Sequence, residues 1–383
     1  MSDQSIERAR EPGRGRQASA PQAIPAKGWK DIVLRTFKEV GQDRVTLIAA
    51  GVTYFLLLAL FPTLTAIISV YGLIVDASTV QEHVNRLAAY LPEGGRNIID
   101  EQLTAFVQQD APTLGIALGV SLALALWSAS SGVKAIFEAM NVAYDEDEKR
   151  GFFVLNLTAL LFTFAGVLGA LFMLACVLGT PVILGFAGLG TSTDWLVQIV
   201  AYVLLAAVLF VGLAVLYRFG PSRQHARWRW ITPGAVLAVV VITAVSALFS
   251  WYAASFAHYE KTYGSLGGLI GFLTWMWICL TAVIVGAELN SETEHQTAKD
   301  STVGKDAPLG ERNASMADTV GPASDAQGED TVKDVTDRSP EWQAGFAAGR
   351  RQVQRHTRSP PLAVAIPAAL AIEALRRRKR DRR

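Results

Sequence analysis

Charge is what this sequence has least of. Only 18% of its 383 residues are charged, whereas 51% are hydrophobic, and a soluble protein carries about 25% charged residues. The missing charge is absent from long blocks between about residues 46 and 287. A soluble core of this composition would have too little polar surface to face water. The sequence therefore predicts an all-α integral membrane protein with several spans.

The residues that hydrolytic and metal-dependent enzymes need are also scarce. Cys176 and Cys279 both lie in apolar blocks, which argues against a disulfide framework or a zinc site. The five histidines occur singly, without the spacing of metal ligands, and no P-loop or nucleophile elbow is present. We therefore predict no catalysis, no metal and no cofactor. A net charge of +1 argues against a nucleic-acid partner as well.

Long apolar segments set the number of spans, because a helix needs about 20 apolar residues to cross a membrane. Six segments qualify: 46–75, 114–133, 151–179, 196–217, 231–256 and 266–285. The third block stays free of charge beyond Gly179-Thr180-Pro181, where we expect a break that leaves 182–193 re-entrant or interfacial. If that block were counted as two spans, the Arg-rich loop at 218–229 would lie on the outer side of the membrane. Six spans instead gather the basic loops on one side, which predicts that both termini are cytoplasmic.

The segments around this predicted six-helix domain, residues 28–290, are polar or amphipathic. Residues 1–27 are expected to be a disordered leader, and residues 291–358 a disordered cytoplasmic tail. The stretch 29–40 has apolar residues at helical spacing among Lys30, Arg35 and Lys38, which predicts an interfacial helix on anionic lipid. Two further amphipathic helices are expected outside, at 78–91 and 96–107.

The last 25 residues combine a short apolar run with a basic cluster. Residues 361–375 are too short to span, and residues 376–383 are almost all Arg or Lys. Such a pair predicts anchoring of the segment 359–383 to anionic lipid at the membrane surface. RNA binding by the same cluster is the less favoured alternative.

Polar residues near the ends of the spans are the functional candidates, because a polar group in a membrane is costly. Ordinary helix ends, snorkelling and aromatic belts are the competing explanations. An acidic residue at a helix C-terminus lacks support from the helix dipole, so we expect Glu288 to pair with Arg218 or Lys134. A second pair is expected four residues apart on one helix, between Lys134 and Glu138. The candidates are Lys134, Glu138, Asn141, Tyr144, Arg218, Tyr259, Tyr263, Glu288 and Asn290.

Several of these residues lie in motifs that resemble the YihY/BrkB family of bacterial inner-membrane proteins. The motifs occur in order between residues 28 and 290: Ala49–Phe55, Trp127–Ser130, Leu216–Pro221, Trp230 with Pro233-Gly234-Ala235, Thr262–Gly267 and Gly286–Asn290. The resemblance implies a six-helix protein of the bacterial inner membrane but no settled activity. Such proteins are often labelled ribonuclease BN, yet a metal-dependent nuclease needs clustered His and Asp ligands, which this sequence lacks.

Two functions remain open on this sequence. A transporter or exporter is favoured by prolines in apolar blocks and by two three-span halves of opposite direction, although no repeat relates the halves. The alternative is a non-transporting envelope scaffold or lipid-interacting protein. A homo-oligomer is compatible with either, and no residue pattern specifies a substrate.

Overall fold

The computed structural model describes residues 3–74, 114–187, 194–255 and 265–325. Over these ranges the chain is helical, with one isolated β-bridge between Ala226 and Thr302. Residues 1–324 form one compact unit, and residues 325–383 form a second. The second unit lies outside the described residues apart from Asp325, and so do the predicted helices at 78–91 and 96–107. The basic cluster at 376–383 also lies there.

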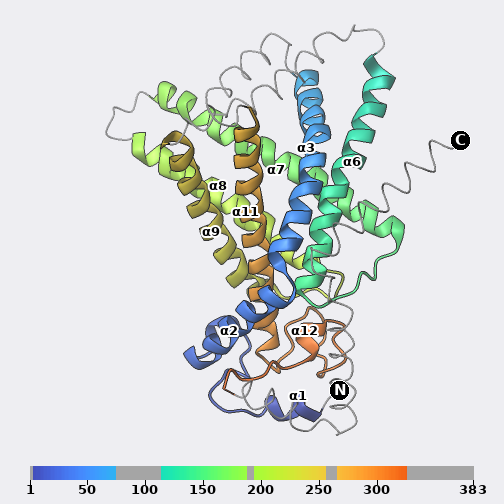
Figure 1. Ribbon diagram of the computed structural model, residues 1–383, viewed down its shortest axis with the longest axis vertical. Helices are drawn as coiled ribbons and strands as arrows, with labels where there is room; N and C mark the ends of the chain where they lie inside the picture. The colour runs from blue at the N-terminus through green and yellow to red at the C-terminus, as the bar shows by residue number, and fades with distance from the viewer. Residues whose placement is uncertain (1–2, 75–113, 188–193, 256–264, 326–383) are drawn as a thin grey trace, which may run out of the picture. The chain divides into compact units, whose positions relative to one another are not determined.

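The described residues of the first unit include six long helices (Figure 1). Each of these helices packs against the next along the chain, and α11 closes the series by contacting α3. The closest pairs are α3 with α6 and α9 with α11. The fold is thus an all-α helix bundle, as predicted. The bounds of the helices are α3 (Val45–Ile74), α6 (Leu114–Ala143), α7 (Phe152–Ala187), α8 (Asp194–Phe219), α9 (Trp228–Ser255) and α11 (Ser265–His295).

Four helices within the described ranges are long and apolar enough to cross a membrane. They are α7, α8, α9 and α11, and the bent pair of α2 (Ala26–Gln42) and α3 raises the number to five. The one predicted span not among these, 114–133, corresponds to α6, a helix of 30 residues. Several spans are therefore established, whereas the number six stays a prediction.

The ends of three helices differ from the sequence prediction. The expected break at Gly179–Pro181 is wrong, because α7 continues as a helix to Ala187. A proline removes one helical hydrogen bond, and an apolar stretch inside a membrane tolerates that loss. Likewise, α6 runs ten residues past the predicted end at 133, and α11 runs ten residues past 285.

A sharp bend separates α2 from the bundle helix that follows it. The axes of α2 and α3 differ by 61°, and Arg44 at the bend has a φ of +52°. A positive φ is strained for a residue with a side chain, so the surrounding contacts must hold it. Helix α2 covers the predicted amphipathic stretch. It turns Asp31 and Arg35 inward and leaves Phe37 exposed.

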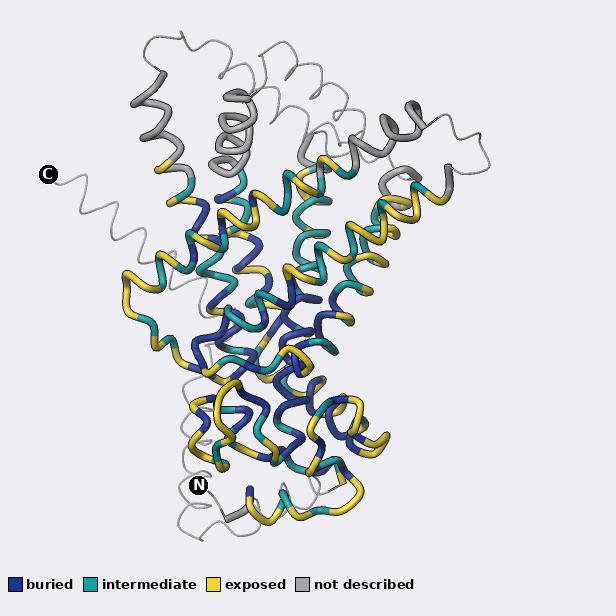
Figure 2. The backbone as a smooth tube through the Cα atoms, turned by 180° about the vertical axis from the view of Figure 1, so that it is seen from behind, coloured by how far each residue is buried: buried dark blue, intermediate teal, exposed yellow. Residues whose placement is uncertain are grey.

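Buried residues concentrate at one end of the bundle (Figure 2). There, apolar side chains of α3, α6, α8, α9 and α11 form one core that includes Val52, Met140, Tyr217 and Ile284. Farther along the helices, large apolar side chains are exposed, among them Phe172 and Tyr202. Exposed apolar surface of this extent suits contact with lipid tails rather than water.

The predictions of a disordered leader and of disorder from residue 291 are wrong for the described part of the chain. The leader contains α1 (Asp3–Arg8) and the 3₁₀ helix η1 (Pro21–Ala23), and the tail contains α12 (Ser315–Asp318). Both segments pack at the buried end of the bundle. Their polar composition suggests solvent exposure, but many of these polar groups hydrogen-bond to one another instead.

Candidate functional site

The end of the bundle that carries the leader is rich in buried polar side chains. We call it the polar end, comprising the leader and α2, the ends of α6, α8 and α11, the start of α9, and residues 296–324. Its buried polar residues include Asp31, Arg35, Asn141, Arg223, Glu288, Asn290, Glu292, Glu294, Gln296 and Thr297. Buried charges are stable only when they are paired and hydrogen-bonded, so each of these groups requires a partner.

One buried ion pair joins the α8–α9 turn to the end of α11. Arg223 Nη2 lies 2.8 and 2.7 Å from the two carboxylate oxygens of Glu294. Ser301 donates a hydrogen bond of 2.6 Å to the same carboxylate. The guanidinium of Arg223 also lies over the ring of Tyr144, 4.6 Å from its centroid. This pair therefore connects α6, α8 and α11 with the segment after α11.

A second network, around Asn141, closes the turn between α6 and α7. Asn141 Oδ1 accepts a 2.7 Å hydrogen bond from the backbone of Ser222, and its amide donates to Glu148 at 3.1 Å. Arg150 binds Glu148 through two hydrogen bonds and donates to the carbonyl of Gly220 at 2.8 Å. Burial disfavours the charged form of Glu148, but the hydrogen bonds from Arg150 and Asn141 outweigh burial and lower the pKa of Glu148 to about 2.

A third network ties the tail to α2. Arg35 Nε lies 2.5 Å from Glu292 Oε2, and the same guanidinium donates to Gln296 Oε1 at 2.8 Å and to the carbonyl of Pro322 at 3.0 Å. Asp31 accepts hydrogen bonds from Arg14 at 2.7 Å and from the backbone of Ser324 at 3.0 Å. Residues separated by more than 250 positions are therefore fixed together.

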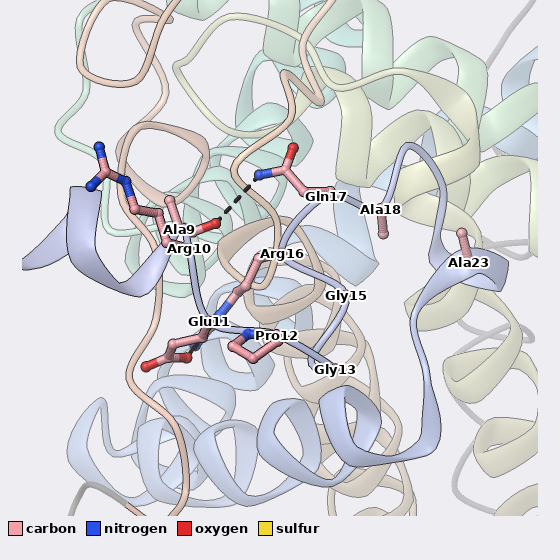
Figure 3. Close-up of a pocket in the computed structure, with 10 residues that line it drawn as sticks. All are labelled: Ala9, Arg10, Glu11, Pro12, Gly13, Gly15, Arg16, Gln17, Ala18 and Ala23. Carbon is pink, nitrogen blue, oxygen red and sulfur yellow. Dashed lines mark hydrogen bonds and ion pairs between the residues drawn. The ribbon is translucent and has the colours of Figure 1, made fainter.

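The leader contributes the remaining contacts of this network. Arg16 binds Glu11 at 2.7 Å and donates to the carbonyls of Gln296 and Gly321 at 3.3 and 2.8 Å. Glu11, Arg16 and Gln17 line a surface cavity of roughly 550 Å³. Figure 3 shows these side chains around it. Glu11 and Arg16, two of the charged residues that line this cavity, already bind each other.

Glu288 and Asn290 lie where α11 crosses the start of α9. The backbone N–H of Gly234 donates to Asn290 Oδ1 at 2.7 Å. A side chain at Gly234 would overlap the carbonyl of Gly286, so these two glycines permit the close crossing. Because Gly234 and Gly286 have no side chains, Asn290 can lie against the backbone of α9.

The carboxyl group of Glu288 is the least compensated charge-bearing group in this region. Glu288 is 1% exposed, and its Oε1 has no hydrogen-bond partner. The Asp43 carboxyl lies within hydrogen-bonding reach, and the carboxyls of Glu39 and Glu292 are also near. The amide nitrogen of Asn290 and the hydroxyl of Tyr144 are buried as well, within reach of each other. These polar atoms form what we call the Glu288 centre: Asp43, Tyr144, Glu288 and Asn290.

The structure separates the other sequence candidates from this centre. The expected pairing of Glu288 with Arg218 or Lys134 is wrong, because Arg218 stacks on Trp228 at 4.5 Å and Lys134 donates to Asn156 at 3.0 Å. The expected pair of Lys134 and Glu138 is also not formed, since Lys134 instead donates to Asn156 and no ion pair joins the two residues in the described structure. The structure brings Tyr144, Glu288 and Asn290 together. Tyr259 and Tyr263 lie outside the described residues.

Sequence reasoning missed the partners of the buried polar groups. The sequence places Arg35 on a predicted interfacial helix and Arg223 in an Arg-rich loop, and it assigns Glu292 and Glu294 to a predicted tail. Asp43 is given no role. One signal was present, because residues 287–295 contain neither Gly nor Pro to end the helix before His295. Within the described ranges, no group of three or more His, Cys, Asp or Glu is placed to hold a metal ion.

Comparison with known proteins agrees with this architecture. The chain is 29% identical over 266 residues to the ribonuclease-like protein YfkH of Bacillus subtilis, which covers 68% of this chain and 93% of YfkH. It is also 32% identical over 97 residues to a UPF0761 membrane protein of Stenotrophomonas maltophilia, and 36% identical over 102 residues to one of Xanthomonas campestris. These two matches span only about a quarter of each relative's length, 23% and 24%. No solved structure matches the chain.

A family model extends the agreement over most of the sequence. The model described as virulence factor BrkB matches residues 36–309. The matched range includes the predicted spans, the Glu288 centre and residues 296–309 of the segment after α11. The chain therefore belongs to the BrkB family of membrane proteins.

Proposed function

We propose that the protein is a proton-coupled membrane transporter whose proton-binding group is Glu288. The observation that carries this proposal is the buried, unpartnered Oε1 of Glu288 beside the carboxyl of Asp43. Two neighbouring carboxylates repel each other, and burial strengthens the repulsion, so a single proton held between them lowers the energy. An uncompensated carboxyl costs stability, and such groups cluster at functional sites.

The position of this pair suits a group that changes partners during transport. Asp43 lies at the bend between α2 and α3, next to the strained Arg44, whereas Glu288 lies on α11. A change in the bend would separate the two carboxyls and expose the proton. Helix breaks next to polar groups are typical of transporter binding sites.

Reconstituted protein tests the proposal without a known substrate. Liposomes that contain a trapped pH-sensitive dye receive a potassium diffusion potential, and internal pH is recorded for wild type, Glu288→Gln and Asp43→Asn. Glu138→Gln is the matched control, because Glu138 is an exposed carboxyl on α6. We expect proton movement in wild type and in the control, and its loss in Glu288→Gln.

Infrared spectroscopy gives an independent readout. A protonated carboxyl should produce a carbonyl band that disappears in Glu288→Gln and persists in Glu138→Gln. The proposal would be contradicted if liposomes with wild-type protein let in no more protons than empty liposomes and the carbonyl band were unchanged in Glu288→Gln. A non-transporting scaffold is the second candidate, and it is favoured by the folded cap that the leader and residues 296–324 form.

We further propose that the polar end faces the cytoplasm of a bacterial cell, in the inner membrane. The basic residues of the leader, the α6–α7 turn and the α8–α9 turn all lie at this end, as the positive-inside rule requires. Exposed Phe37 with Lys30 and Lys38 on α2 suits contact with anionic lipid. A single cysteine at the exposed Gln224 should react with a membrane-impermeant maleimide only in permeabilised cells.

The name of the Bacillus relative raises RNA hydrolysis as a further question. We propose that this chain is not an enzyme, because its described residues offer no ligand group for the metal that hydrolytic nucleases use. Purified protein should leave a fluorogenic RNA intact with Mg²⁺, Mn²⁺ or Zn²⁺. Cleavage in proportion to the amount of protein would overturn this expectation.

A further inference from the structure

The turn between α8 and α9 holds more positive charge than its carboxylates neutralise. Arg150 is paired with Glu148 at 2.7 Å, and Arg223 with Glu294 at 2.7 Å. Arg218 makes no ion pair in the part of the chain that the structure describes. Its guanidinium instead lies over the rings of Trp228 and Phe219, at 4.5 and 5.4 Å from their centroids.

Two buried nitrogen atoms at this turn lack hydrogen-bond partners. They are Nε of Arg218 and Nδ1 of His225. The ring of Phe219 joins the two residues, because it contacts His225 at 4.8 Å between ring centroids and also lies under Arg218. Burial, together with the charges of Arg218, Arg223 and Arg150, lowers the pKa of His225. An anion at this place would satisfy both nitrogens and offset the positive field.

The surroundings indicate where that anion comes from. Arg218 occupies the last turn of one apolar span, and Trp228, which is half exposed, begins the next. Val211 and Val236, farther along the same two helices, are also exposed. Tryptophan and arginine at the ends of spans are typical of the headgroup level of a membrane. A lipid phosphate reaches this level without leaving the bilayer.

We propose that Arg218, His225 and Trp228 form a binding site for the phosphate group of an anionic phospholipid. Arg218 and His225 donate hydrogen bonds to the phosphate oxygens, since charge-assisted bonds from arginine suit phosphate. The Trp228 ring holds the guanidinium in place from one side. The lipid tails then lie along the exposed apolar residues of α8 and α9.

Thermal unfolding of the full chain in mild detergent tests the site. The unfolding midpoint is measured with added phosphatidylglycerol, phosphatidylcholine or inorganic phosphate, because a ligand of the native state raises it. We expect phosphatidylglycerol alone to raise the midpoint. In Arg218→Gln its half-saturating concentration should rise about tenfold, the loss expected for a charged hydrogen bond. Arg229→Gln removes an exposed arginine of the same region and should behave as wild type.

Three outcomes would overturn the proposal. If phosphatidylcholine raised the unfolding midpoint equally, a charged headgroup would not be needed. If inorganic phosphate raised it equally, the ligand would be a soluble phosphate rather than a lipid. An unchanged response in Arg218→Gln would place the lipid elsewhere.

A measurement on the wild-type chain avoids the case in which Arg218→Gln fails to fold. NMR of histidine-labelled protein follows the protonation of His225, which faces Arg150, Arg218 and Arg223. A bound phosphate places negative charge beside the imidazole, so phosphatidylglycerol should raise the pKa of His225. A pKa that is the same with and without this lipid would contradict the site.

Discussion

Replacing Arg35 by methionine should destabilise the protein by about 3–5 kcal/mol, the usual effect of removing one partner of a buried ion pair. The side chains of Arg35 and Glu292 are each only 2% exposed. Without Arg35, the Glu292 carboxylate stays buried beside the carboxyls of Glu39 and Glu288, with only the imidazole of His295 at 3.5 Å from it. Gln296 Oε1 and the carbonyl of Pro322 lose their donor as well.

Equilibrium unfolding by urea in mild detergent measures this loss, and limited trypsin digestion reports whether residues 296–324 remain attached. Asp306→Asn is the matched control. It breaks the ion pair with Arg227, in which the side chains are 31% and 81% exposed, so it should cost less than about 1 kcal/mol. The double variant Arg35→Met/Glu292→Leu should recover much of the stability, because no buried charge is left unpaired.

A stability of Arg35→Met within about 1 kcal/mol of wild type, with the segment 296–324 still resistant to trypsin, would contradict this prediction. That result would mean that the contacts of Arg35 are not what holds the segment against α2. A failure of the double variant to recover stability would instead show that packing around the two side chains matters more than their charge.

Three further predictions concern single contacts. Gly234→Ala should lower thermal stability by at least about 1–3 kcal/mol through overpacking, whereas Gly212→Ala, which meets open space, should be neutral or stabilising. The pKa of Glu148 falls from 4.5 to about 2 in the folded protein. Its carboxylate therefore stabilises the folded protein fully above pH 4.5, and this contribution disappears as the pH falls towards 2. Unfolding of Glu148→Gln and wild type should thus differ at pH 6 and converge near pH 2. Tyr217→Phe, which removes a 2.8 Å hydrogen bond to the carbonyl of Val283, should cost about 0.5–1.5 kcal/mol in the same assay; no loss would show that the hydroxyl is otherwise satisfied.

The membrane helices could be predicted because lipid imposes a composition on each span separately. A charge-free run of 20 residues is visible without knowing its neighbours, and the predicted start of each described span lies within three residues of the observed one. The break expected at Pro181 was wrong, because one missing hydrogen bond does not end an apolar helix.

The polar end could not be predicted in the same way, because its stability depends on pairs that are distant in sequence. Ser291 to Glu294 have the composition of a solvated tail, and only the position of Arg35 and Arg223 in space explains their burial. Glu288 was singled out correctly as a buried acid, but its neighbour Asp43 was not. Burial of a charge follows from its location in a span, whereas the identity of its partner follows from the fold.

The pairing of the leader with the tail has a consequence for biosynthesis. Arg16 leaves the ribosome early, yet its carbonyl acceptors on Gln296 and Gly321 are made 280 and 305 residues later. Arg35 is likewise synthesised long before its partners Glu292 and Pro322. Because long-range contacts form only after the chain between them has been ordered, the polar end assembles after α11 has been inserted. A chain truncated at residue 295 would carry its spans but lack the carbonyl acceptors of Arg16 on Gln296 and Gly321, so protection of the leader from protease reports complete synthesis.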